Sequence, residues 1–303
     1  MFLAPIIIFA FNRLAPLKAC VASLLSNVES KDSDLFVFVD GARPSRSGEA
    51  EKVGAVRKYV KTITGFKSVS CHFSDVNKGL AASVIGGVTE VINEYGMAIV
   101  VEDDLILAPS FLAFMNTMLQ GYANDKRIMQ ISGFSTKIKN YKQYNCDYYM
   151  SARAQSWSWA TWQDRWNTID WEVKDFDKLA NNKQEQKAFN KYGSDLFGML
   201  KKWRLGLNNS WYIRFCYSMH KQNRFCILPI RSLVYNDGFG NDATHTTCYN
   251  RYKIDFLKDN FDWRMVDDLV WNESLAREAV KYWSIPYRIY GKLITMLNNG
   301  FKK

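Results

Sequence analysis

Short apolar runs alternate with stretches of helical spacing over the first 131 residues. A run rich in Val, Ile and Phe is typical of a strand that is buried on both faces. The predicted strands are residues 5–11, 35–39, 69–73, 97–101 and 128–131. The predicted helices are centred on Leu17 to Leu25, 52–61, 77–95 and 109–122. Strands that alternate with helices predict an α/β fold with a mostly parallel central sheet flanked by helices.

The pattern changes after about residue 145, where aromatic residues become dense and the regular alternation fades. Residues 175–195 are polar and predict an exposed helix or loop, whereas 211–222 predict a helix and 225–229 a strand. Trp159, Trp162 and Trp166 have helical spacing, which is more typical of a core than of a ligand-binding stripe. We expect most of these tryptophans in the core and one or two in the wall of a sugar pocket. The candidates for that wall are Trp157, Trp159 and Trp211.

The most informative stretch is residues 96–105, in which five apolar residues run directly into Glu102, Asp103 and Asp104. A buried strand that ends in acids brings negative charge to the carboxyl edge of the sheet, where open α/β folds bind ligands. Alternation along a strand would place Glu102 and Asp104 on one side and Asp103 on the other. Clustered carboxylates favour a divalent cation such as Mn²⁺ or Mg²⁺. The alternative is an acidic turn in which an aspartate caps the next helix.

Two other strands also end in charged residues. Asp40 closes the second strand and Arg13 follows the first. A carboxylate can accept from a ribose hydroxyl or a base N–H, and a cation can neutralise a diphosphate, so this edge suits a nucleotide. Asp242 and His245 lie in the glycine-broken loop 238–246, which can approach a ligand closely. Asp40 is equally typical of a plain turn, and a lone loop histidine is more often structural.

Composition narrows the class of protein. Hydrophobic content of 48% excludes a disordered chain, and the net charge of +10 suggests an acidic partner such as nucleotide phosphates or an anionic membrane surface. A nucleic-acid binder would need a basic stripe in a recognisable module, which is not found. The six cysteines form no C-x-x-C pair, so we expect free thiols and no zinc site. The apolar start lacks the features of a signal peptide and no run is long enough to cross a membrane, so we expect a cytoplasmic protein.

The last segment, residues 282–303, mixes aromatic and aliphatic residues with lysine and arginine. This pattern predicts a basic amphipathic helix. Such a helix could lie on the inner face of an anionic cell membrane, or it could pack on the protein.

The combined pattern resembles the GT-A class of nucleotide-sugar glycosyltransferases, whose hallmark is an acidic D-x-D-type motif at a strand end. Residues 101–111, Val-Glu-Asp-Asp-Leu-Ile-Leu-Ala-Pro-Ser-Phe, are similar to a segment of N-acetylglucosaminyltransferase I. Residues 157–166 and 238–246 resemble segments of bacterial capsule and O-antigen glycosyltransferases. The resemblance implies a GT-A (Rossmann-like) fold. Within it we expect a nucleotide-sugar-binding half (1–145), an acceptor-binding half (146–281) and the tail (282–303).

The resemblance also implies roles for individual residues. Asp104 and His245 would hold the metal, usually Mn²⁺, and Glu102 and Asp103 would bind ribose and sugar. Asp40 would contact the nucleoside. The donor-binding set would be completed by Phe11, Asn12, Arg13, Asn77, Lys78 and Gly79. The implied reaction moves a sugar from a nucleoside-diphosphate sugar, with a UDP-sugar favoured, to a hydroxyl of a glycan or lipid-linked glycan.

One departure from the family concerns the general base. N-acetylglucosaminyltransferase I carries its catalytic acid near a tryptophan, where this chain has Trp211-Tyr-Ile-Arg214. Asp242 and Asp164 are the substitutes that we would test first, and the stereochemistry of transfer stays open. A nucleotidyltransferase or pyrophosphorylase, and a catalytically silent sugar-nucleotide binding protein, are the alternative functions.

Overall fold

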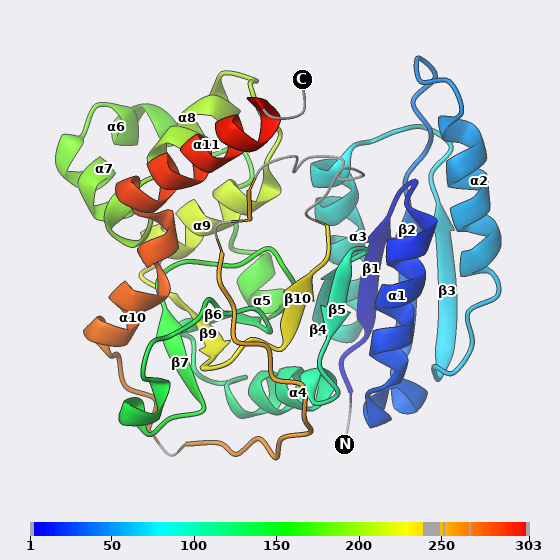
Figure 1. Ribbon diagram of the computed structural model, residues 1–303, viewed down its shortest axis with the longest axis horizontal. Helices are drawn as coiled ribbons and strands as arrows, with labels where there is room; N and C mark the ends of the chain where they lie inside the picture. The colour runs from blue at the N-terminus through cyan, green and yellow to red at the C-terminus, as the bar shows by residue number, and fades with distance from the viewer. Residues whose placement is uncertain (1–2, 239–248, 251, 267, 301–303) are drawn as a thin grey trace.

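The computed structural model describes residues 3–238, 249–250, 252–266 and 268–300 (Figure 1). Its described residues form an eight-stranded sheet in the order β3-β2-β1-β4-β8-β6-β9-β7. The strands are β1 (Ile6–Ala10), β2 (Asp34–Val39), β3 (Ser68–Phe73), β4 (Met97–Glu102), β6 (Ile128–Ser132), β7 (Tyr148–Ser151), β8 (Trp159–Trp162) and β9 (Phe225–Pro229). A two-stranded sheet pairs β5 (Leu105–Leu107) with β10 (Val234–Asn236).

The large sheet has two halves of different character. Strands β3, β2, β1 and β4 are all parallel. Strand β8 runs antiparallel to both β4 and β6, β9 is parallel to β6, and β7 is antiparallel to β9. The mostly parallel α/β sheet expected from the sequence is therefore confirmed, and the direction changes only in the second half.

Helices cover both faces of the sheet, with the amino-terminal ones beside β1–β3 and α6–α11 beside the other half (Figure 1). They are α1 (Leu14–Leu25), α2 (Glu49–Val60), α3 (Leu80–Tyr95), α4 (Phe111–Gly121), α5 (Gln163–Trp166), α6 (Phe176–Ala180), α7 (Lys183–Phe189), α8 (Leu196–Arg204), α9 (Trp211–Lys221), α10 (Glu273–Ala279) and α11 (Ile285–Gly300). Ile6 and Ile8 of β1 pack in the core with α1, α2 and α4, whereas Ile7 and Phe9 pack with α3 and α9. Both faces of β1 are thus buried, as its continuous apolar run requires.

The tryptophan-rich segment differs from its predicted helical spacing. Trp159 and Trp162 lie in β8, which is buried along its whole length, and only Trp166 lies in the short helix α5. Three tryptophans at intervals of three and four satisfy a helix, but the chain here turns from strand to helix between the second and the third. The position of β8 between β4 and β6 joins the two halves of the sheet.

Candidate functional site

The three acids lie where β4 ends. Glu102 is the last residue of β4, and Asp103 and Asp104 form the turn into β5. One nitrogen of Arg13, Nη2, donates to Asp103 Oδ1 at 2.5 Å and to Asp104 Oδ2 at 3.0 Å. The expectation that Asp103 would face away from Asp104 is therefore wrong. Strand alternation stops at Glu102, and the turn brings both aspartates onto the same guanidinium.

The cluster is buried and contains three acids beside one arginine, so its negative charge is not fully neutralised. Burial raises the pKa of Asp103 to about 6, since the opposing effect of Arg13 is partly cancelled by repulsion from Asp104. Burial and the two aspartates also raise the pKa of Glu102 well above its ordinary value. Burial alone would lower the pKa of Arg13, but the two aspartates outweigh it and raise it. A cluster with perturbed pKa values at a sheet edge is a candidate functional site.

Asp104 carries an oxygen that no described residue contacts by a hydrogen bond. Its Oδ1 is buried and has no hydrogen-bond partner among the described residues. Mg²⁺-type cations are usually held by one or two carboxylates together with substrate phosphates, so one free carboxylate oxygen fits such a cation. Among the described residues, no group of three or more His, Cys, Asp and Glu side chains could hold a metal by itself. The residues present therefore fit a metal that is shared with a phosphate ligand.

The chain after β10 returns to the same acid. Asp237 N donates to the Asp104 carbonyl at 3.0 Å, and Asn236 Oδ1 accepts from Gly238 N at 2.7 Å. A Cβ added to Gly238 would lie 2.0 Å from Asp104 Oδ2, so only glycine fits. That this loop approaches a ligand stays a prediction; its first residue lies close to Asp104. Asp242 and His245 lie outside the described residues.

Asp40 organises the turn that opens α3. Its Oδ1 accepts from the backbone N–H groups of Gly41 and Lys78 at 2.9 Å, and its Oδ2 accepts from Gly79 N at 2.8 Å. Asn77 Nδ2 adds a bond to the Gly41 carbonyl at 2.8 Å. The structure thus brings together four residues of the expected donor set. A carboxylate has about four lone-pair sites, so these three bonds leave Asp40 roughly one site for a ligand.

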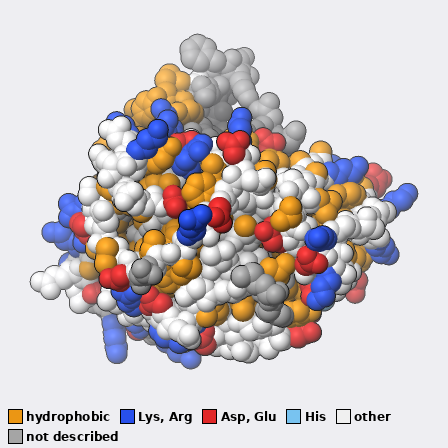
Figure 2. All heavy atoms as spheres, turned by 90° about the horizontal axis from the view of Figure 1, so that it is seen from below, with side chains coloured by type: hydrophobic (Ala, Val, Ile, Leu, Met, Phe, Trp, Pro, Cys, Tyr) orange, Lys and Arg blue, Asp and Glu red, His pale blue; other side chains and the backbone are white. Residues whose placement is uncertain are grey.

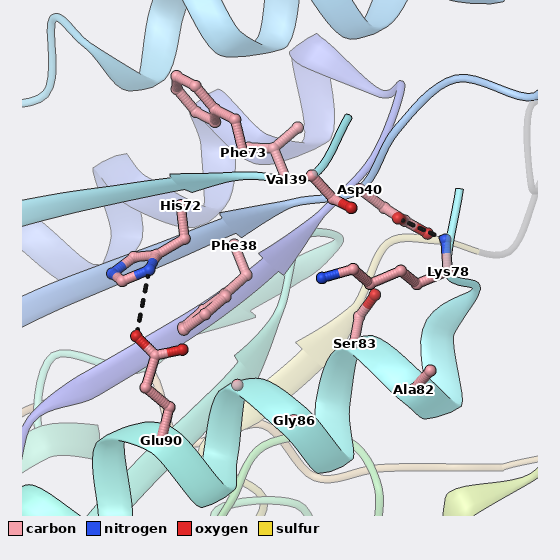
Figure 3. A pocket seen from close by; sticks show the side chains of 12 residues that line it. Phe38, Val39, Asp40, His72, Phe73, Lys78, Ala82, Ser83, Gly86 and Glu90 are labelled. Carbon is pink, nitrogen blue, oxygen red and sulfur yellow. Dashed lines mark hydrogen bonds and ion pairs between the residues drawn. The ribbon is translucent and has the colours of Figure 1, made fainter. Parts of the chain in front are cut away.

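A cavity of about 460 Å³ opens beside this turn, between the ends of β2 and β3 and helix α3 (Figure 3). Phe38 stacks on His72 at 4.4 Å between ring centroids, and His72 Nδ1 lies 3.4 Å from Glu90 Oε1. On the helix side, a Cβ added to Gly86 would meet no atom within 4 Å. The side chain of Lys78 extends over the opening. Sequence reasoning missed this cavity, although the Gly86-Gly87 pair within a predicted helix was a signal for it.

The loop after β1 is fixed by a network that the sequence analysis did not anticipate. Arg43 forms an ion pair with Glu49, and Asn12 Nδ2 donates to Glu49 Oε1 at 3.2 Å. The Arg43 guanidinium lies 5.4 Å from the centre of the Phe11 ring. Hydrogen bonding from Arg43 lowers the pKa of Glu49 to about 2. Arg43 therefore packs on Phe11, and Glu49, the first residue of α2, holds Asn12, whereas Arg13 is held by the two aspartates.

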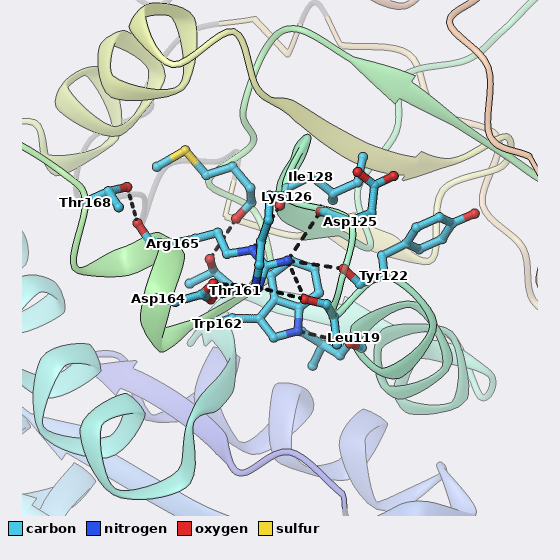
Figure 4. Close-up of polar contacts among 12 residues, drawn as sticks. Leu119, Tyr122, Asp125, Lys126, Ile128, Thr161, Trp162, Asp164, Arg165 and Thr168 are labelled. Atoms are coloured by element: carbon cyan, nitrogen blue, oxygen red, sulfur yellow. Dashed lines mark hydrogen bonds and ion pairs between the residues drawn. The ribbon is translucent and has the colours of Figure 1, made fainter.

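Asp164 does not belong to this site. Because β8 runs antiparallel to β4 and Trp162 pairs with Met97, Asp164 lies at the start of β4 while Asp104 follows its end. Six strand residues span about 20 Å. Asp164 instead pairs with Lys126 and Arg165, each at 2.7 Å (Figure 4). The prediction that Asp164 could act as the base is wrong, because the strand before it reverses direction.

The prediction that Trp157, Trp159 and Trp211 line a sugar pocket also needs correction. Trp159 is fully buried and packs on Trp166 and on Trp211, with ring centroids 5.6 and 5.0 Å away. Trp211 is also buried, so these two belong to the core and present no face to a sugar. Trp157 is half-buried and contacts Phe134 edge-on at 4.6 Å. Of the three, only Trp157 stays a candidate for the pocket wall.

Comparisons with known proteins complete the description. No family model and no curated protein matches the chain. Two solved structures of S. aureus TarS are similar: residues 1–349 at a TM-score of 0.42 and 12% identity, covering 78% of this chain, and a longer form at 0.33 and 12%, covering 43%. The chain spans 61% and 21% of those two structures. A UDP-glucose pyrophosphorylase complexed with UDP-glucose is similar at 0.39 and 10% identity, covering 78% of this chain and 94% of its own. These values are low, so the α/β class rests on the observed strand order.

Proposed function

We propose that this protein is a metal-dependent glycosyltransferase that uses a nucleoside-diphosphate sugar. The observation that carries the proposal is the buried, unpartnered Oδ1 of Asp104, beside Arg13 and at the carboxyl end of an inner parallel strand. A free carboxylate oxygen and a guanidinium suit the two halves of a metal–diphosphate group. A UDP-sugar is the favoured donor, and the acceptor is a hydroxyl of a glycan or lipid-linked glycan in bacterial surface polysaccharide synthesis.

The proposed mechanism assigns separate tasks to the residues of the site. A bound Mn²⁺ or Mg²⁺ held by Asp104 would stabilise the charge that develops on the leaving diphosphate. Arg13 binds the same diphosphate, and Glu102 and Asp103 orient the ribose and the sugar. Asp40 and the turn at Lys78 position the nucleoside beside the cavity of α3.

Transfer also requires a group that takes the proton of the acceptor hydroxyl. Asp242 stays the candidate base, and His245 stays the candidate second ligand. Helix α9 starts at Trp211, where the family has its acid, and Arg214 of that helix donates to the carbonyls of Ser210 and Trp171. The first turn of α9 therefore supplies no carboxylate.

A thermal-shift panel of UDP-, GDP-, TDP- and CMP-sugars, each with and without Mn²⁺, tests the proposal. We expect one nucleotide to raise the melting temperature, and to do so only with Mn²⁺. Asp104→Asn should lose the metal-dependent part of the shift. Equal shifts in Mn²⁺ and in EDTA would contradict the proposal. With the stabilising donor in hand, release of a nucleoside diphosphate rather than pyrophosphate separates a glycosyltransferase from a pyrophosphorylase.

The carboxyl-terminal helix supports the proposed membrane partner. Helix α11 is confirmed as a helix, and its large apolar side chains are 52–67% exposed at Ile285, Ile289, Tyr290, Leu293, Met296 and Leu297. At 100° per residue these positions share one face. Residues 281–303 contain five Lys or Arg and no Asp or Glu. An apolar face on a purely basic segment fits an anionic lipid surface.

Helix α11 also contacts Tyr249, which follows the glycine loop in the sequence. Tyr249 N donates to Thr295 Oγ1 at 3.0 Å, and the rings of Tyr249 and Tyr290 meet edge-on. Ten residues separate Tyr249 from Gly238, which lies against Asp104. We propose that a membrane on the apolar face of α11 presents the lipid-linked acceptor to the enzyme. Within the described part of the chain, none of the helices combines the length and apolar character that a membrane crossing needs.

Vesicle flotation tests the membrane proposal. We expect the protein to float with vesicles that contain anionic phosphatidylglycerol and not with phosphatidylcholine alone. A double change of Ile289 and Leu293 to Ser should abolish flotation, whereas Val28→Ser, at an apolar site outside α11 that is more exposed than either, should not. Equal flotation of both variants, or a stable dimer that the double variant dissociates, would contradict it.

The face of the molecule in Figure 2 carries acidic and basic side chains intermixed, so it offers no basic stripe for nucleic acid.

A further inference from the structure

Arg13 has an unusual position within the acidic cluster. Its Nη2 is shared between Asp103 and Asp104, and its side chain is only 21% exposed. No other hydrogen bond of its guanidinium is found within the described residues. Arginine side chains that serve a structural role commonly use two nitrogens on one carboxylate. Arg13 thus keeps most of its donors free while it neutralises the two aspartates.

The carboxylate oxygens that Arg13 contacts lie next to the oxygen that would bind a metal. Arg13 contacts Asp104 through Oδ2, and the unpartnered oxygen Oδ1 belongs to the same carboxylate. A divalent cation at Oδ1 would therefore lie a few Å from a guanidinium of like charge, and like charges at that distance repel strongly in a half-buried site. A diphosphate offers Arg13 a better partner, because its oxygens match the guanidinium fork.

We infer that Arg13 is an exchangeable counter-cation: it occupies the acids in the free protein, weakens metal binding there, and transfers to the donor diphosphate when both ligands bind. Metal and nucleotide therefore bind cooperatively through Arg13. The inference rests on the proposed function, because it takes Asp104 as the metal ligand. By linkage, the factor by which nucleotide strengthens metal binding equals the factor by which metal strengthens nucleotide binding.

Mn²⁺ binding followed by electron paramagnetic resonance, with and without UDP, tests this inference. Arg13→Met should bind Mn²⁺ alone about tenfold more tightly than the wild type, within the usual range of coupling. The strengthening of Mn²⁺ binding by UDP should shrink in the same variant. Arg127→Met is the matched control, since it removes an arginine that pairs with Asp125 just before β6. This control should leave both quantities unchanged.

Arg13→Lys separates an effect of charge from one of misfolding. A lysine keeps the positive charge beside the acids, so this variant should bind Mn²⁺ alone as weakly as the wild type. The inference is overturned if Arg13→Met binds Mn²⁺ no more tightly than the wild type. It is also overturned if Arg13→Lys binds Mn²⁺ as tightly as Arg13→Met does. If Asp104→Asn binds Mn²⁺ in the presence of UDP as tightly as the wild type does, the proposed function itself is overturned.

Discussion

Two clusters of arginine and aspartate among the described residues are built from the same groups in different proportions. Arg153 meets Asp195 with two parallel bonds of 2.9 Å, one from each terminal nitrogen, and stacks 4.5 Å over Trp283. Arg13 meets Asp103 and Asp104 with a single nitrogen. The first cluster matches one charge with one, whereas the second places one cation against several acids.

The electrostatic consequences of the two clusters are opposite. Burial would raise the pKa of Asp195, but Arg153 outweighs it and lowers the pKa below its ordinary value. Burial wins at Asp103, whose pKa rises to about 6. The first pair joins Arg153, after β7, to Asp195 at the start of α8, and its charges balance; the second cluster has more acids than cations. We propose that this difference separates a structural ion pair from a cluster that binds a ligand.

The largest expected effect is on turnover, in the unmatched cluster. Asp104→Asn keeps the size of the side chain and removes its charge, so release of nucleoside diphosphate from the stabilising donor should fall by about two to three orders of magnitude. The melting temperature of the free protein should not fall. Turnover at the wild-type rate would show that the unmatched cluster is not the site.

The matched cluster should respond in stability instead. Asp195→Asn leaves Arg153 buried without its counter-charge, so the free energy of unfolding measured in urea should fall by about 3–5 kcal/mol. Metal-dependent donor binding by the folded fraction should persist. Loss of donor binding without loss of stability would erase the distinction between the clusters.

The pH dependence of stability sharpens the comparison. The pKa of Asp103 is about 6 in the folded protein against an ordinary 3.8, so the folded state binds more protons between these values. The contribution of Asp103 to stability therefore falls as the pH rises from about 4 to 6 and is level above that window. Asp103→Asn should remove this fall and be more stable than the wild type at pH 8 by about 1–3 kcal/mol. Urea unfolding of the wild type and of Asp103→Asn at pH 4, 5, 6 and 8 measures the fall and the difference at pH 8. If the free energy of unfolding has the same pH dependence in both proteins, the raised pKa of Asp103 is contradicted.

The smallest expected effect lies in the cavity beside Asp40, outside both clusters. Gly86→Ala should stabilise α3 by about 0.5–1 kcal/mol, because an added Cβ meets no neighbour and alanine favours a helix. Gly86→Leu should fill the cavity and weaken donor binding. Thermal shifts of the two variants with the same donor provide the comparison, and equal donor binding by both would exclude the cavity from the site.

The sequence predicted the parallel half of the fold because β1, β2 and β4 are continuous apolar runs between helices, whereas β3 is a more polar, partly exposed strand at the edge of the sheet. It did not predict β7 and β8, which are four residues long and rich in aromatic side chains. Trp159, Trp162 and Trp166 satisfied a helical period by coincidence. Because β8 runs antiparallel to β4, Asp164 lies at the edge of the sheet opposite to the one that holds Asp104.

The candidate site shows the same division. Arg13, Asp40 and the three acids follow parallel strands, and such ends share one edge, so the sequence could bring them together. The shared guanidinium depends on a turn that strand alternation does not describe. The pairing of Arg153 with Asp195 joins residues 42 positions apart and carries no local signal.

The central claim is that Asp104 holds a cation shared with the donor diphosphate. Anomalous diffraction from a crystal soaked with Mn²⁺ and UDP measures this most directly. The account predicts one manganese peak at about 2 Å from a carboxylate oxygen of Asp104, with the guanidinium of Arg13 on the diphosphate. A peak remote from the end of β4, or UDP bound elsewhere, would contradict it.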